Sequence, residues 1–360
     1  VQVGKLQLVV ELSTSGTEAA QGVHAGSRRP PDDVTVDQTG SSSGPLVGAL
    51  FQPSSGASST QSRRPHSLNM PSKRWEIEGE SLIGRGEECD IVLAKPTVSR
   101  RHARIFADAG VFYLEDCGST NGTFLNGDRL DARAALSVGN VVSLGSTALT
   151  FDGSGLTAFE SEQGIGIQVN ALTTSVPGQN GKTHIRLLDS FSLRFPRGRY
   201  VGLLGVYGSG KSTLMSSLNG RRKPSSGTVL YEDQDLYDHF ELFRPQIAFV
   251  PQQVIFHEEL LVFRALFYAA KLRLPEDTSR AEIERAVTEV LEILGLSGVS
   301  RTRITNLSGG EKKRVAIGME LLTRPRVLFL DEATSGLDHA TEEKMMELFR
   351  RVAEHGTTIV

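Results

Sequence analysis

Apolar and polar residues alternate in a series of short runs between residues 75 and 151. The runs are RWEIE, DIVL, HARIFA, VFYLED, VVSLG and ALTF, and Gly, Asn and Asp residues separate them. Alternation with a period of two is typical of half-buried β-strands, and no helical period accompanies it here. The pattern therefore predicts an all-β sandwich over residues 75–151.

A different pattern begins near residue 165, where apolar runs alternate with helical segments as far as residue 360. This order is typical of an α/β domain with a largely parallel sheet. Residues 152–164 between the two patterns are predicted to be a linker. The expected fold class is thus multi-domain, with an all-β sandwich followed by an α/β domain.

The first 72 residues carry a weaker signal. From residue 13 onward Ser, Gly, Pro, Thr and Gln dominate, a composition that favours a disordered linker. The opening VGKLQLVVEL alternates like a strand, either as a remnant of an upstream domain or as a short extended tail. Because the chain begins at Val1 and stops within the strand-like run GTTIV, we expect it to be a piece of a longer protein.

Composition narrows the function classes. A chain of 360 residues with 39% hydrophobic residues is long enough for two or three cores, and a net charge of −3 gives no support for a nucleic-acid partner. Two cysteines, Cys89 and Cys117, do not form a disulfide framework, and both are expected to pack in a reducing compartment. There is no apolar run of about 18 residues, so we expect this stretch neither to span a membrane nor to be exported.

The stretch GVYGSGKST, residues 205–213, lies between the apolar run YVGLLG and the helical run LMSSLNG. Its G-x-x-x-x-G-K-S spacing predicts a phosphate-binding loop whose glycines let the backbone N–H groups point inward. Lys211 is expected to pair with the β- and γ-phosphates of ATP, and the Ser212 hydroxyl to bind Mg²⁺. The predicted ATP-binding residues here are Gly205, Gly208, Ser209, Gly210, Lys211, Ser212 and Thr213.

Two further apolar strands end in polar side chains. RVLFLDEATSGLD ends its strand at Asp331 and Glu332, and IAFVPQQ leads to Gln252. Asp331 is expected on the Mg²⁺ side of the nucleotide and Glu332 to act as the general base on a water molecule. The Gln252 amide is expected to reach Mg²⁺ or that water, so the predicted Mg²⁺ ligands are Ser212, Gln252 and Asp331.

Together with LSGGE at residues 307–311, these stretches resemble the ATP-binding cassette (ABC) ATPases, over residues 165–360. The resemblance implies a homodimer in which two cassettes pack head to tail and the signature turn of one caps the γ-phosphate held by the other. A Ser hydroxyl and backbone amides at a helix N-terminus form such an anion site. The resemblance gives this role to Ser308, Gly309, Gly310 and Glu311, and it places Asp338 at the dimer seam.

The stretches FHEELLVFRALFYAAKLRLP and GEKKRVAIGMELLTRP resemble the subfamily G type. That resemblance implies a C-terminal transmembrane domain in the full polypeptide and a place on the cytoplasmic face of the cell membrane, with this fragment itself soluble. Departures from the family are Val206 and Tyr207 in the phosphate loop, Ala333 in DEAT and Val176 near the expected adenine position. The chain also ends before the family's switch histidine.

The stretches LIGRG, VSRRHA and STNGTFLNG fall on loops between the predicted strands and resemble the forkhead-associated (FHA) domain, over residues 75–151. This family reads phosphothreonine, which needs a bidentate cation and several hydrogen-bond donors. His102 is expected to be a structural brace. The residues expected to bind phosphothreonine are Arg85, Ser99, Arg100, Thr120 and Asn121.

The function indicated is an ATP-hydrolysing subunit of an ABC transporter that is regulated or recruited through its FHA domain. The FHA ligand is expected to be a phosphothreonine protein or the chain's own linker, phosphorylated at Thr35, Thr39 or Thr60. One alternative is a soluble ABC ATPase with an FHA recruitment module, although such proteins usually carry coiled-coil insertions or tandem cassettes. Another, a scaffold with an inactive cassette, conflicts with intact Lys211 and Glu332.

Overall fold

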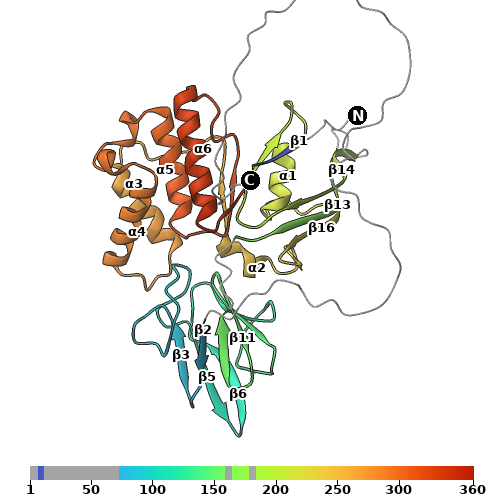
Figure 1. Ribbon diagram of the computed structural model, residues 1–360, viewed down its shortest axis with the longest axis vertical. Coiled ribbons are helices and arrows are strands. Elements are labelled where there is room, and N and C mark those ends of the chain that lie inside the picture. The colour runs from blue at the N-terminus through green and yellow to red at the C-terminus, as the bar shows by residue number, and fades with distance from the viewer. Residues whose placement is uncertain (1–6, 12–72, 159–163, 178–183) are drawn as a thin grey trace, which may run out of the picture. The chain divides into compact units, whose positions relative to one another are not determined.

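The computed structural model describes residues 7–11, 73–158, 164–177 and 184–360 (Figure 1). Two units divide the chain, one of residues 1–13 with 69–360 and one of residues 14–68. The linker predicted over residues 13–72 lies outside the described residues. Within the described ranges, no helix is long and apolar enough to cross a membrane.

The first domain is a β-sandwich, as the alternating pattern predicted. One sheet has the strand order β2-β12-β11-β10-β7-β8 and the other the order β4-β3-β5-β6-β9. Fully buried side chains such as Ile105 and Leu149 form the core between them. The strands are β2 (Lys73–Glu76), β3 (Ser81–Gly84), β4 (Ile91–Val92), β5 (Ala103–Asp108), β6 (Val111–Asp116), β7 (Thr123–Leu125), β8 (Asp128–Arg129), β9 (Ala134–Ala135), β10 (Val141–Leu144), β11 (Thr147–Phe151) and β12 (Gly155–Ala158).

The prediction of a linker over residues 152–164 is wrong for the first half of that range. Strand β12 pairs with both β11 and β2, and it buries Leu156 completely. The run GLTA is too short to show an alternating pattern, so only its pairing with β2, far away in sequence, reveals the strand.

The second domain is built on a parallel sheet. Strands β15 (Tyr200–Leu204), β20 (Thr358–Ile359), β19 (Val327–Leu330) and β18 (Ile247–Val250) follow one another in that order and pair in parallel. A second, antiparallel sheet has the order β14-β13-β16-β17. Its strands are β13 (Ile167–Pro177), β14 (His184–Phe195), β16 (Ser226–Tyr231) and β17 (Gln234–Asp235).

The strand-like run at the start of the chain joins this parallel sheet. Strand β1 (Gln7–Glu11) pairs antiparallel with β15, in a register that sets Gln7 opposite Leu204 and Glu11 opposite Tyr200. The run is therefore an edge strand of the parallel sheet and not a free tail.

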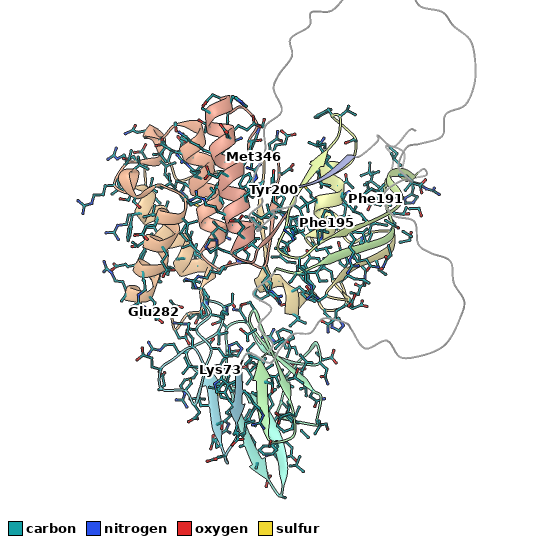
Figure 2. The ribbon with its side chains drawn as sticks, viewed as in Figure 1. Lys73, Phe191, Phe195, Tyr200, Glu282 and Met346 are labelled. Atoms are coloured by element: carbon teal, nitrogen blue, oxygen red, sulfur yellow. The ribbon has the colours of Figure 1, made fainter. Side chains whose placement is uncertain are left out.

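Helices cover both faces of the parallel sheet (Figure 1). Leu328 of β19 packs into a core with the helical side of the domain, whereas its neighbour Phe329 packs with α1 between the two sheets. The Tyr200 hydroxyl donates to Met346 Sδ at 3.2 Å, which joins α6 to β15 (Figure 2). The helices are α1 (Lys211–Leu218), α2 (Phe240–Phe243), α3 (Val262–Arg273), α4 (Arg280–Ile293), α5 (Gly309–Leu321) and α6 (His339–Glu354).

Helices α3, α4 and α5 pack closely around Gly318 of α5. A Cβ at this glycine would lie 2.7 Å from Leu294 Cδ1 and 3.2 Å from side-chain atoms of Leu266 and Val290. A side chain here would force Leu294 to shift, so glycine lets the three helices approach this closely.

Candidate nucleotide-binding and phosphothreonine-binding sites

The predicted phosphate loop connects the end of β15 to the start of α1. Gly208 and Gly210 have φ angles of 77° and 96°, in the left-handed region that favours glycine, and Gly210 is the N-cap of α1. The Lys211 ammonium donates to the carbonyl oxygens of Gly205 at 2.6 Å and Val206 at 3.2 Å. Ser209 Oγ is buried without a hydrogen-bond partner among the described residues. An ammonium, a spare hydroxyl and the amides of a helix N-terminus fit the phosphates of a nucleotide.

The parallel strand order brings the other predicted residues to the same edge of the sheet. Asp331 follows β19, which pairs with β18, and its N–H donates to Val250 at 3.0 Å. Burial and the neighbouring Glu332 raise the pKa of Asp331, while a hydrogen bond from Ser212 and the charge of Lys211 oppose the rise. A half-buried carboxylate beside a serine hydroxyl is a donor set that fits Mg²⁺.

Glu332 and Gln252, the two residues predicted to act in catalysis, lie next to each other. The Gln252 amide donates to the Glu332 carboxylate at 2.6 Å. Glu332 also has a φ of 51°, a conformation that costs a residue with a side chain about 1–3 kcal/mol and often marks a functional site.

Lys313 is a site residue that the sequence analysis did not identify. Its ammonium donates to the carbonyl oxygens of Glu332, at 3.3 Å, and of Ser335. Lys313 therefore ties α5 to the loop that carries the predicted general base. The signal available in the sequence was its place in the run GEKKR, but that run alone does not show which lysine turns toward the loop.

The signature turn has an additional local role. Ser308 caps α5, and its hydroxyl accepts from the N–H of Glu311 at 3.3 Å and donates to the carboxylate of Glu311 at 2.7 Å. Gly309 and Gly310 are the first residues of the helix, so their N–H groups belong to its N-terminus. The predicted contact of this turn with a second cassette stays a prediction.

Asp338, predicted at the dimer seam, caps α6 within its own chain. Its carboxylate accepts from the Thr341 N–H at 3.0 Å and from the Thr341 hydroxyl at 2.6 Å. The same threonine restricts the signature turn, since a Cβ at Gly310 would lie 2.6 Å from Thr341 Cγ2. The two segments are thus packed together by one side chain.

In the β-sandwich, the loops predicted to bind phosphothreonine meet at one end. Ser99 is 4% exposed, and its hydroxyl accepts from the Thr120 N–H at 3.1 Å. The Asn121 amide donates to the Thr97 carbonyl at 2.7 Å. Arg85 is held by the Val98 carbonyl, which its Nε–H reaches at 3.0 Å.

His102 is the structural brace that the sequence predicted. It is fully buried; its Nδ1 accepts from the Ser99 N–H at 3.0 Å, and its Nε2–H donates to the Gly122 carbonyl at 3.1 Å. This tautomer leaves neither ring nitrogen for acid–base chemistry.

His102 is expected to make the stability of the sandwich depend on pH. Burial lowers the pKa of His102, and the hydrogen bond to Gly122 only partly opposes this. Because the unfolded chain binds a proton below about pH 6.5 and the folded one binds it only at lower pH, the free energy of unfolding falls as pH drops from 7 to 5. Urea titration followed by the fluorescence of Trp75, the single tryptophan of the chain, measures this loss. In His102→Gln, which cannot titrate, the unfolding free energy is expected to fall less over the same interval; an equal fall would contradict the assignment.

The two cysteines differ from the prediction that both pack. Cys89 is buried, with its Sγ 3.0 Å from the Arg100 carbonyl oxygen, but Cys117 is exposed. The reason is the turn that follows: the Asp116 carboxylate accepts from the N–H groups of Gly118 and Ser119, both at 2.9 Å. This turn directs the Cys117 side chain outward.

Comparison with known proteins finds a family for each of the two domains. Residues 188–335 match the ABC transporter family and residues 81–145 match the FHA domain family. The ATP-binding/permease protein Rv1747 of Mycobacterium tuberculosis is 39% identical over 287 residues, which cover 78% of this chain and 32% of that protein. The methionine import ATP-binding protein MetN 1 of Yersinia pestis bv. Antiqua is 40% identical over 188 residues, covering 51% of this chain and 54% of that protein.

Two further comparisons concern the second domain. ABC transporter G family member 14 of Arabidopsis thaliana is 40% identical over 169 residues, covering 45% of this chain and 26% of that protein. A dimeric structure of a bacterial ABC transporter cassette matches with 26% identity and a TM-score of 0.47, over 54% of this chain and 86% of that chain. The chain thus spans about a third of Rv1747 and about half of MetN 1. The chain therefore contains an ABC transporter domain and, in front of it, an FHA domain.

Proposed function

We propose that this chain binds and hydrolyses ATP as the cassette of an ABC transporter, and that its FHA domain regulates or recruits it by binding phosphothreonine. The observation that carries the ATPase proposal is the shared edge of the parallel sheet. There the phosphate loop after β15, Gln252 after β18 and the pair Asp331 and Glu332 after β19 converge. The domains would comprise residues 73–158 and 164–360.

In this mechanism the phosphate loop holds the triphosphate, and Lys211 neutralises part of its charge. Ser212, Asp331 and Gln252 would hold Mg²⁺, which supplies further neutralisation of the phosphates when bound. Glu332 takes a proton from the attacking water, and the 2.6 Å hydrogen bond from Gln252 orients its carboxylate. Lys313 fixes the backbone on which Glu332 sits.

A second cassette is the proposed partner, because the N-terminus of α5 offers backbone N–H groups and the Ser308 hydroxyl to a phosphate. In such a dimer Ser308 would exchange its bond to Glu311 for one to the nucleotide. The name of Rv1747, an ATP-binding/permease protein, supports a transmembrane domain as the other partner, with the cassette on the cytoplasmic side.

The experiment that tests this function measures equilibrium ATP binding and phosphate release in the purified protein with Mg²⁺. The proposal is supported if ATP binding depends on Lys211 and ATP hydrolysis depends on Glu332. Absence of ATP binding by the wild-type protein would refute it.

The phosphothreonine proposal predicts that Arg85→Ala lowers affinity for phosphothreonine peptides by about 10- to 100-fold. The reason is the loss of the charge-assisted hydrogen bonds that a guanidinium makes to a phosphate. The ligands are a peptide mixture degenerate around one fixed phosphothreonine and peptides of this chain phosphorylated at Thr35, Thr39 or Thr60, titrated by calorimetry.

Arg104→Ala is the matched control, since Arg104 lies on β5 of the same domain and pairs with Glu80 and Glu115. It is expected to bind like wild type. Equal affinity for phosphorylated and plain peptides would contradict phosphothreonine recognition, as would unchanged binding by Arg85→Ala.

A further inference from the structure

Arg85, the cation proposed to bind phosphothreonine, contacts an acidic turn of the cassette. We use the term acidic turn for residues 275–282, which comprise the segment before α4 and its first residues. One terminal nitrogen of Arg85 donates to the carboxylate of Glu282, and the other lies 3.2 Å from Asp277 Oδ1. The Arg85 side chain is only 11% exposed as a result.

A second donor of the sandwich completes the contact. The backbone N–H of Arg100 donates to Asp277 Oδ2 at 2.5 Å, so the Asp277 carboxylate bridges a guanidinium and a backbone amide. The hydroxyl oxygen of Thr278 lies 3.2 Å from the same nitrogen of Arg85 that contacts Asp277. Two carboxylates flanking a threonine oxygen present about the charge of a phosphothreonine dianion, roughly −1.5 to −2.

The acidic turn is also held in shape by its own residues. Ser279 caps α4, and its N–H donates to Glu282 Oε2 at 2.8 Å, which leaves Oε1 of that carboxylate for Arg85. The Thr278 N–H donates to the Pro275 carbonyl at 2.9 Å. A preformed turn loses little conformational entropy when it docks, which favours binding.

The sandwich and cassette meet at a second place. The Gly127 carbonyl of the β7–β8 turn lies 3.3 Å from His239 Nδ1 of the cassette, and a Cβ at Gly127 would lie 3.0 Å from that nitrogen. This contact does not involve any of the residues predicted to bind phosphothreonine. Because the two domains belong to one chain and also meet at Gly127, the contact at Arg85 forms without loss of translational freedom.

We propose that the acidic turn is an internal ligand of the FHA domain, which competes with phosphothreonine for Arg85 and the Arg100 N–H. The inference rests on the proposed phosphothreonine recognition. A guanidinium whose Nε–H is bound to Val98 and whose terminal nitrogens hold Asp277 and Glu282 has no bidentate face left for a phosphate. A phosphothreonine ligand therefore binds only the fraction of molecules in which the turn has left the site.

The test compares phosphothreonine affinity in the full chain and in the double variant Asp277→Asn, Glu282→Gln. These substitutions keep the side-chain shapes and the capping position of residue 282 but remove both charges. The double variant is expected to bind the tightest of the phosphothreonine peptides about tenfold more strongly than wild type. Glu284→Gln is the matched control, because that carboxylate lies on the same helix and pairs with Arg280 instead of the sandwich.

Adding Arg85→Ala to the double variant separates the two proposals. Tighter binding by the double variant that is lost again with Arg85→Ala supports the internal ligand. Binding that requires Arg85 but is equal in wild type, the double variant and Glu284→Gln overturns the internal ligand and leaves phosphothreonine recognition standing. No binding by any variant overturns both.

Amide hydrogen exchange gives a readout within the cassette itself. Saturating phosphothreonine peptide is expected to speed exchange in residues 275–282 of the wild-type chain, because the turn loses its partner. Unchanged exchange there, with peptide bound, would overturn the internal ligand.

Discussion

Replacing Lys211 with alanine is expected to weaken ATP binding by at least about 100-fold, the largest binding effect of any single substitution in the cassette. The Lys211 ammonium sits on the phosphate loop, 2.6 Å from the Gly205 carbonyl oxygen. From there it is placed to make charge-assisted hydrogen bonds to the phosphates of ATP. Each factor of ten in affinity corresponds to about 1.4 kcal/mol, so losing two such bonds accounts for the expected change.

The measurement is equilibrium binding of labelled ATP to wild type and variant. Lys223→Ala is the control, since Lys223 lies after α1 with its ammonium 5.9 Å from the ring centroid of Tyr237, outside the phosphate loop. It should bind ATP like wild type. Lys211→Ala with wild-type affinity would remove the phosphate loop from the proposed site.

Glu332→Gln is expected to bind ATP normally and to hydrolyse it about 10² to 10⁴ times more slowly, the range typical of removing a general base. The amide keeps the shape of the carboxylate and the left-handed backbone at φ 51°, so any strain in the loop is unchanged. It cannot accept a proton from water. Only the rate of the hydrolysis step is therefore expected to fall.

Single-turnover phosphate release, measured alongside ATP binding, distinguishes the two steps. The control is Glu343→Gln, which makes the same chemical change at an exposed residue of α6 away from the site. It is expected to leave ATP binding and phosphate release unchanged. Normal phosphate release by Glu332→Gln would mean that another group activates the water.

The parts of the site that could be predicted are those specified by neighbouring residues. Gly208 and Gly210 mark left-handed positions at a fixed distance from Lys211, and an apolar strand ending in Asp331 carries its own signal. A parallel sheet places the carboxyl ends of β18 and β19, and so Gln252 and Glu332, at the same edge.

What could not be predicted depends on partners far away in sequence. Lys313 reaches the Glu332 carbonyl only because α5 packs beside that loop, and one of the two partners of β12 is β2, about eighty positions earlier. The sequence of the acidic turn predicts only an ordinary helix start, because Ser279 and Glu282 have the spacing of a capping box. Nothing in that spacing indicates that Arg85, almost two hundred positions earlier, shares the Glu282 carboxylate.

The glycine at the crossing of α3, α4 and α5 has a mechanical consequence. Side chains of α3 and of the C-terminal end of α4 pack directly onto Gly318 of α5, so the three helices are in close contact at this point. A displacement of the start of α4 is therefore expected to move α5 with it, including the helix turn that begins at the signature residues.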